Sequence, residues 1–187
     1  MTDRLTKTDW LDHGLTTLAH EGIGAVKADR MAKAMGVSRG SFYWHFRDIR
    51  DFLGQLLQHW QDRTTDRIIE KHPVAANAAV QLRGLIRRGF SSDQRLDHAV
   101  RTWASDDADV AALVAAVDTR RVQHIARLME AGGLAAATAA ARANFIYWAL
   151  LGKMLVADPA LARLSSEAID DIGRLFAGSD RPAETAS

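Results

Sequence analysis

The sequence predicts an all-α protein, and three observations lead to that fold class. No stretch of useful length alternates apolar and polar residues as a strand would. Apolar residues instead recur three and four positions apart, which is the spacing of a helix face. Only three prolines interrupt the 187 residues, a length that suits one or two small domains with a sizeable core.

The first predicted helix runs from Leu5 to Glu21. Gly22 and Gly24 follow it directly, as glycines commonly do where a helix ends. Its buried stripe is expected to comprise Trp10, Leu11, Leu15 and Leu18.

The stretch from Ala28 to Phe46 has the pattern of a helix-turn-helix, a motif that places its second helix in the major groove of DNA. Gly36 stands where the turn needs a positive φ, and Ser38 is expected to cap the second helix through its hydroxyl. The apolar seam is expected to comprise Met31, Met35, Val37 and Phe42. The residues off that seam, of types that contact phosphates and base edges, are Arg39, Ser41, Tyr43 and Trp44.

Asp48 is expected to cap a fourth helix that continues to about Lys71, and His72-Pro73 then marks a helix stop and a domain boundary. The predicted organisation is a helix-turn-helix domain at 1–50, a connecting helix at 48–71, a helical domain at 73–178 and a frayed tail at 179–187.

Five helices are expected beyond the boundary. They are Val74 to Phe90, Arg95 to Ala104, Asp107 to Ala131, Leu134 to Ala157, and a last helix with Pro159 in its first turn that ends near Gly178. Gly132-Gly133 is expected to close the third of them.

Charge distribution supports nucleic-acid binding more than the total charge does. The formal net charge is only +1. Between Lys27 and Arg50, however, six basic and two acidic side chains give a local charge of +4. Positive charge beside a helix-turn-helix is what binding to DNA requires, although without that motif an ordinary solvated face would be the better explanation.

The segment Gly-Val-Ser-Arg-Gly-Ser-Phe-Tyr-Trp-His-Phe, residues 36–46, resembles the turn and recognition helix of the tetracycline-repressor (TetR) family of bacterial regulators. The close similarity covers about residues 6 to 57. It implies an N-terminal three-helix DNA-binding domain and a C-terminal domain that binds a ligand and dimerises. An ordinary helical hairpin is the alternative.

The resemblance implies that the helix from Arg39 to His45 enters the major groove. Arg39 is then the first choice for a base contact and Ser41 the second, while Gly40 lets the backbone lie close to the duplex. The positions expected to contact phosphate or to pack beside the DNA backbone are Tyr43, Trp44 and His45, and Ser38 is expected to be a further DNA-binding residue. For Trp44, packing against the first helix is the alternative.

Two positions depart from the family pattern. Ile49 stands where the family usually has a phosphate-binding lysine, so Arg47 or Arg50 would have to replace it. Lys27 stands where a threonine or serine usually caps the second helix; lysine cannot cap, but it can bind phosphate as a point charge.

The resemblance also implies a small-molecule pocket in the C-terminal domain. Arg121 and His124 interrupt an apolar stripe through Val110, Val114, Val117 and Leu128, so they line a cavity or have partners, Asp118 being the nearest candidate. The other expected pocket residues are Arg101, Trp103, Tyr147 and Trp148, of which the last two are of types that more often lie in a core or an interface.

The last two helices imply a homodimer. The helix with Phe145, Trp148 and Leu155 is apolar on more than one face, and Gly152 within it suggests close helix approach. A reader of palindromic double-stranded operator DNA also needs two subunits.

Other classes of protein have little support. The scattered histidines show no metal-ligand spacing, and no glycine-rich phosphate loop or catalytic group is visible, so no cofactor, metal or enzyme activity is expected. With no cysteine, no secretion signal and no membrane-length apolar run, we expect a cytoplasmic protein that is not bound to a membrane. The sequence therefore predicts a dimeric repressor released from DNA by a small-molecule effector; a ligand-independent or architectural DNA-binding protein, or an activator of the same fold, is the alternative.

Overall fold

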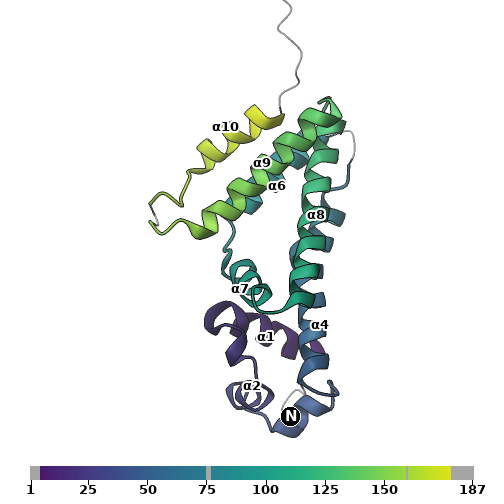
Figure 1. Ribbon diagram of the computed structural model, residues 1–187, viewed down its shortest axis with the longest axis vertical. Coiled ribbons are helices and arrows are strands. Elements are labelled where there is room, and N and C mark those ends of the chain that lie inside the picture. The colour runs from purple at the N-terminus through teal and green to yellow at the C-terminus, as the bar shows by residue number, and fades with distance from the viewer. Residues whose placement is uncertain (1–4, 75–76, 159, 178–187) are drawn as a thin grey trace, which may run out of the picture. The chain divides into compact units, whose positions relative to one another are not determined.

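The computed structural model describes residues 5–74, 77–158 and 160–177, and every regular element among them is a helix (Figure 1). This confirms the predicted fold class. The elements are α1 (Lys7–Glu21), η1 (Ile23–Ala25), α2 (Ala28–Ala34), α3 (Arg39–Tyr43), α4 (Ile49–Gln61), η2 (Asp62–Asp66), α5 (Arg67–Lys71), α6 (Ala78–Ser91), α7 (Arg95–Ala104), α8 (Ala108–Ala131), α9 (Ala136–Leu155) and α10 (Ser166–Ala177).

The chain divides into two compact units. The first unit holds the described residues up to Arg67 together with Gln94–Val117, and the second holds Ile68–Asp93 together with the described residues from Asp118 onward. The sequence predicted a single boundary at residue 73, whereas the structure also assigns α7 and the first half of α8 to the N-terminal unit. Packing explains the difference, because α7 lies against α1 and the Trp60 indole donates a 2.8 Å hydrogen bond to Asp97.

The first unit is built around a cluster of aromatic side chains. Trp10, Phe42 and Phe52 are each fully buried. A Cβ on Gly14 would come within 2.6 Å of the Phe52 ring, so this glycine allows α4 to approach α1 closely. The predicted stripe of α1 is also confirmed, since its four members are all buried. The recognition segment is therefore attached to a rigid core.

Local signals set the ends of the first helices much as predicted. Thr6 and Asp9 form a reciprocal capping box that starts α1, and Asp48 accepts a 2.8 Å hydrogen bond from the Asp51 amide at the start of α4. Gly36 has the predicted positive φ, +68°. The connecting helix does reach Lys71, but its middle turn, η2, is a π-helix.

The second unit contains α6, the second half of α8, α9 and α10, with α10 running beside α6 and α9 (Figure 1). Its buried core includes Leu82, Leu128, Ile146 and Ile169. Among the described residues, no helix is long and apolar enough to cross a membrane.

The predicted start of the last helix is wrong. α10 begins at Ser166, seven residues after Pro159, because the Ser165 hydroxyl accepts a 3.1 Å hydrogen bond from the Ala168 amide and caps the helix there. Residues 160–162 form a turn instead. Pro159 itself, Gly178 and the predicted tail lie outside the described residues.

Candidate nucleic-acid interface

The recognition helix α3 is short and firmly seated. Phe42, the only residue of α3 that is fully buried, contacts the rings of Trp10, Phe46 and Phe52 at centroid distances of 5.1–5.4 Å. The chain enters α3 through the turn at Gly36, where the Val37 amide donates a 3.0 Å hydrogen bond to the Ala32 carbonyl. One face of α3 is therefore fixed in the core, and the other is left for contacts outside the unit.

The predicted base-reading and phosphate-contacting side chains lie on that other face. Arg39 and Gly40 are exposed and Ser41 is half-buried. Tyr43 is 47% exposed and Trp44 is 75% exposed. With three quarters of its surface exposed, Trp44 is not packed into the core against the first helix, as the alternative would require.

Arg39 and Tyr43 are linked along α3. The Arg39 guanidinium donates a 3.0 Å hydrogen bond to the Tyr43 hydroxyl and lies 5.6 Å from the centroid of that ring. This contact holds the guanidinium over α3, and the hydrogen bond raises the pKa of Arg39 above its ordinary value. Tyr43, one helical turn further along, thus positions Arg39, the side chain that the sequence predicted as the first choice for a base contact.

Ser38 does not act as predicted. It occupies the N-cap position of α3, but its hydroxyl makes no capping hydrogen bond; the start of the helix is closed by the Ser38 carbonyl, which accepts from the Ser41 amide at 3.0 Å. The Ser38 side chain is exposed, so its hydroxyl remains available for a contact with phosphate.

His45 has an internal role that the sequence did not reveal. Its Nε2 lies 3.0 Å from the Leu5 carbonyl oxygen, and its ring is half-buried. The side chain therefore attaches the segment before α1 to the end of the recognition segment. Only the fold brings residues forty positions apart together in this way.

The expected phosphate-binding cations are all exposed. Lys27 is at the N-cap position of α2 and makes no capping bond, as expected for lysine. Arg47 is 3.4 Å from the Asp48 carboxylate but has a side chain that is 83% exposed, and Arg50 is exposed at the start of α4. Lys33 on α2 is exposed as well. It is one of the six basic residues counted between Lys27 and Arg50, but it was not among the predicted site residues.

Carboxylates occupy the N-terminus of α4. The Asp51 amide donates to Asp48, and the Arg47 amide donates to Asp51, which lowers the pKa of both carboxyl groups. Ile49 is 37% exposed and offers no charge. The two carboxylates thus already accept from these amides, and the cations at this end of α4 are the side chains of Arg47 and Arg50.

The six expected pocket residues fall into both units. Arg101 and Trp103 belong to the first unit, where Trp103 is part of the core. Trp148 is 65% exposed on α9, so it does not line an internal pocket. Trp103 thus packs in the core of the first unit, and the exposure of Trp148 fits the interface that was its alternative, because helix periodicity cannot tell one core from another or a core from an interface.

Arg121 has an internal partner, as the alternative to pocket lining required. Its guanidinium donates to the Tyr147 hydroxyl at 3.5 Å, and that hydroxyl donates to Asp118 at 2.6 Å. Tyr147 therefore bridges the arginine and the aspartate that the sequence suggested as a pair. Burial is the main cause that raises the pKa of Tyr147 to about 12.

His124 is buried in the second unit, with only 3% of its surface exposed. Burial lowers its pKa, the positive charge of Arg127 lowers it further, and a hydrogen bond with the His72 backbone opposes both effects. Within the described part of the chain, its Nε2 atom has no hydrogen-bond partner. Nor do the described residues contain a group of three or more acidic or histidine side chains that could hold a metal ion.

Comparison with known proteins agrees with this architecture. Residues 11–56 match the family model described as "Bacterial regulatory proteins, tetR family". The HTH-type transcriptional regulator AcrR of Shigella flexneri is 35% identical over 51 residues, which are 27% of this chain and 24% of AcrR. The similarity to AcrR thus covers about a quarter of that protein and is limited to one segment.

Solved structures extend the similarity of fold to nearly the whole chain. A crystal structure of a TetR/AcrR family member is 18% identical with a TM-score of 0.76, covering 92% of this chain and 98% of that one. A TetR-family transcriptional regulator from Rhodococcus sp. is 19% identical with a TM-score of 0.65, covering 91% and 96%. A TetR-family member from Streptomyces coelicolor A3 is 15% identical with a TM-score of 0.65, covering 92% and 98%. Residues 11–56 therefore match the model of the tetR family of bacterial regulatory proteins, and nearly the whole chain has a fold similar to that of solved TetR-family regulators.

Proposed function

We propose that the protein is a cytoplasmic transcriptional repressor that binds palindromic double-stranded operator DNA as a homodimer and is released by a small-molecule effector. The observation that carries DNA binding is the outer face of α3. There Arg39 and Ser41 lie on a helix whose inner face is fixed by the buried Phe42, and Trp44 follows the helix directly. A rigid helix with an arginine at its start suits base reading in the major groove, since a guanidinium can bridge two acceptors of guanine.

Phosphate contacts would come from side chains on both sides of α3. Lys27 lies before α2, and Arg47 and Arg50 lie at the start of α4. They replace the lysine that the family usually has at the position of Ile49. Point charges of this kind position a protein on the duplex without reading its sequence.

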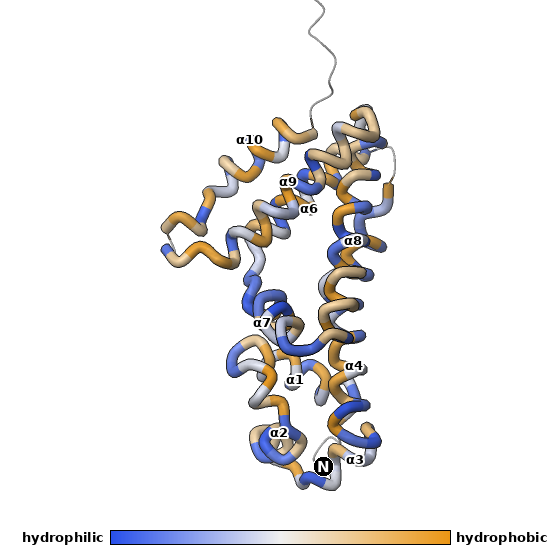
Figure 2. The backbone as a smooth tube through the Cα atoms, viewed as in Figure 1, coloured by the Kyte–Doolittle hydropathy of each residue, from blue (hydrophilic) through white to orange (hydrophobic). Residues whose placement is uncertain are grey.

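The homodimer would form through α9 and α10. Phe145, Trp148 and Leu155 on α9 are 58%, 65% and 76% exposed, and Leu175 on α10 is 73% exposed. Figure 2 shows the hydrophobic stretches along both helices. Gly152 is on the same face of α9, and a Cβ there would meet no atom within 4 Å. An apolar surface of this extent is typical of a protein interface, and a second copy would bury it.

Two observations support effector binding: the fold shared with solved TetR-family structures, and the buried Nε2 of His124 in the second unit, which has no hydrogen-bond partner among the described residues. A ligand that donates a hydrogen bond to this nitrogen would satisfy it. Repression would follow if the dimer competes with RNA polymerase for promoter DNA, and the effector would favour a dimer in which the two recognition helices no longer fit successive grooves.

The decisive experiment is to select genomic DNA fragments with the purified protein and sequence them. We expect enrichment of a palindrome whose half-sites are about one helical turn, roughly 10 base pairs, apart. Transcription in vitro from an enriched promoter then distinguishes a repressor from an activator. Retention of all fragments alike would contradict the proposal and favour the architectural alternative, and a compound library that never changes DNA binding would favour the ligand-independent one.

A further inference from the structure

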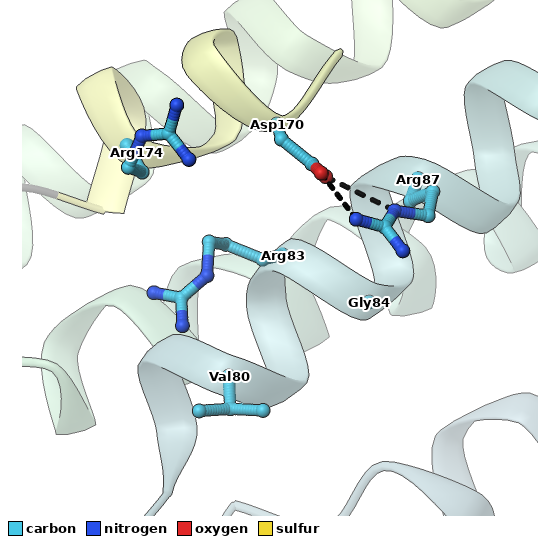
Figure 3. Close-up of a pocket in the computed structure, with 6 residues that line it drawn as sticks. All are labelled: Val80, Arg83, Gly84, Arg87, Asp170 and Arg174. Carbon is cyan, nitrogen blue, oxygen red and sulfur yellow. Dashed lines mark hydrogen bonds and ion pairs between the residues drawn. The ribbon is translucent and has the colours of Figure 1, made fainter. Parts of the chain in front are cut away.

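A pocket of about 250 Å³ lies between α6 and α10 in the second unit, and none of its lining residues was assigned to DNA binding or effector binding above. Its lining comprises Val80, Arg83, Gly84, Arg87, Asp170 and Arg174 (Figure 3). Three guanidinium groups and a single carboxylate thus border one small space.

The charges of this pocket are not balanced. The single lining carboxylate, Asp170, is already engaged with Arg87, whose Nε donates to it at 3.0 Å. Arg174 pairs with Asp171, which lies outside the lining; both side chains of that pair are more than 60% exposed. An exposed pair of this kind contributes about 0–1 kcal/mol, so Arg174 can exchange its partner at little cost.

Arg83 is the group that points to a ligand. It is half-buried, and within the described ranges it has no ion pair or hydrogen bond. Figure 3 shows its guanidinium turned away from the Arg87–Asp170 pair. The stem of Arg83 packs against α10 at Gly173, where a Cβ would lie 3.4 Å from Arg83 Cγ. The absence of a side chain at Gly173 lets Arg83 lie close against α10.

We propose that this pocket binds a small, multiply charged anion that carries phosphate or carboxylate groups. Arginine donates paired hydrogen bonds that match the oxygens of both groups, and the lining as a whole has a net charge of +2. The volume is below the range of roughly 300–1,000 Å³ that is typical of pockets for drug-sized ligands, which favours a compact ion over a large apolar compound.

The pocket and the proposed dimer face lie on different sides of α10. At about 100° per residue, Asp170 and Arg174 are close to each other around the helix and roughly 100–140° from Leu175. A dimer that buries Leu175 therefore leaves the arginine side of the helix accessible. The anion site does not depend on the DNA-binding proposal, and its test does not use DNA affinity.

Isothermal titration of the full chain with inorganic pyrophosphate and, separately, citrate tests the proposal at constant ionic strength. We expect saturable binding of at least one probe with one site per chain. Preference for pyrophosphate or for citrate then identifies the ligand as a phosphate or a carboxylate. No measurable binding of either probe at millimolar concentration would overturn the proposal.

Three substitutions locate the site. Arg83→Gln should weaken binding roughly tenfold or more, because it removes a charged donor. Asp170→Asn should strengthen binding, since it removes the competing carboxylate; a purely structural role for the Arg87–Asp170 pair predicts the opposite or no change. Arg163→Gln, an exposed arginine of the same unit outside the lining, is the matched control and should bind as the unchanged chain does.

Two controls separate loss of the site from unfolding and from binding elsewhere on the protein. Thermal unfolding should show that Arg83→Gln stays folded, and Arg174→Gln provides a second variant with the same expected loss if it does not. Arg39→Gln should retain full anion binding. If Arg39→Gln loses anion binding instead, the probes bind at the DNA interface. If a short DNA duplex displaces pyrophosphate from Arg39→Gln, the pocket contacts nucleic acid. Either result would overturn the proposal.

Discussion

The Arg39 guanidinium donates a hydrogen bond to the Tyr43 hydroxyl at 3.0 Å, one helical turn further along the recognition helix. Both side chains are exposed, so the contact is made at the surface. It orients the guanidinium before any DNA is present. When Arg39 contacts a guanine, its guanidinium either keeps the hydrogen bond to Tyr43 or gives it up. Substituting each residue separately therefore distinguishes the contribution of Arg39 to DNA binding from that of Tyr43.

Arg39→Ala should cost roughly 1–3 kcal/mol of operator affinity and relax the preference at one base pair in each half-site. Tyr43→Phe keeps the ring and removes only the hydroxyl, so it should leave the base preference unchanged while altering affinity by less than Arg39→Ala. Binding to a library of randomised sites measures both effects. If Arg39→Ala retains the original base preference, Arg39 does not read a base.

Lys27, Arg47 and Arg50 are predicted to bind phosphates in place of the missing lysine. Changing one of them to glutamine in each subunit should weaken binding to all sequences about equally and reduce the slope of log affinity against log salt by roughly one to two units per dimer. Arg47 should show the smallest change, because it also pairs with Asp48. Arg163→Gln is the control for charge alone, and an unchanged slope would place the tested residue away from the backbone.

Substitutions of two exposed tryptophans should distinguish dimerisation from DNA binding. Trp148→Ala should weaken the dimer, since it removes apolar surface from α9, whereas Trp44→Ala should leave the dimer intact and weaken DNA binding. Replacing Gly152 by leucine should also weaken the dimer, because the added side chain would push apart the helices that pack at this face of α9. Analytical ultracentrifugation at micromolar concentration measures the assembly. A wild-type chain that sediments as a monomer there would contradict the proposed dimer.

His124 should make the stability of the protein depend on pH. Burial lowers its pKa in the folded state below the unfolded value of about 6.5, so the unfolded state binds the proton more tightly. Its contribution to stability is therefore fully present above the unfolded pKa and is lost as the pH falls through the folded pKa.

Urea unfolding at pH 7.5 and at lower pH, compared between the wild type and His124→Leu, isolates this effect. The wild type should lose more stability than the variant as the pH falls. Equal losses in the two proteins would show that His124 stays neutral, or is charged, in both states alike.

The local structure of the N-terminal half could be predicted from the sequence. The glycine of the turn, the aspartate that caps α4 and the apolar seam of the helix-turn-helix act within a few residues, so short-range sterics and hydrogen bonding decide them. The exposed face of α3 followed from the same periodicity, since Phe42 had to be buried and its neighbours could not all be.

Tertiary structure alone decided which core each helix joins. Trp103 packs in the first unit and Trp148 remains exposed, although Trp148 has the more apolar neighbours in the sequence. Contacts between distant residues, such as His45 with Leu5 and Tyr147 with Asp118, depend on how helices cross. The arginine pocket between α6 and α10 has the same origin. Its residues come from two segments about ninety positions apart, and no local sequence pattern predicts that their charged side chains lie together.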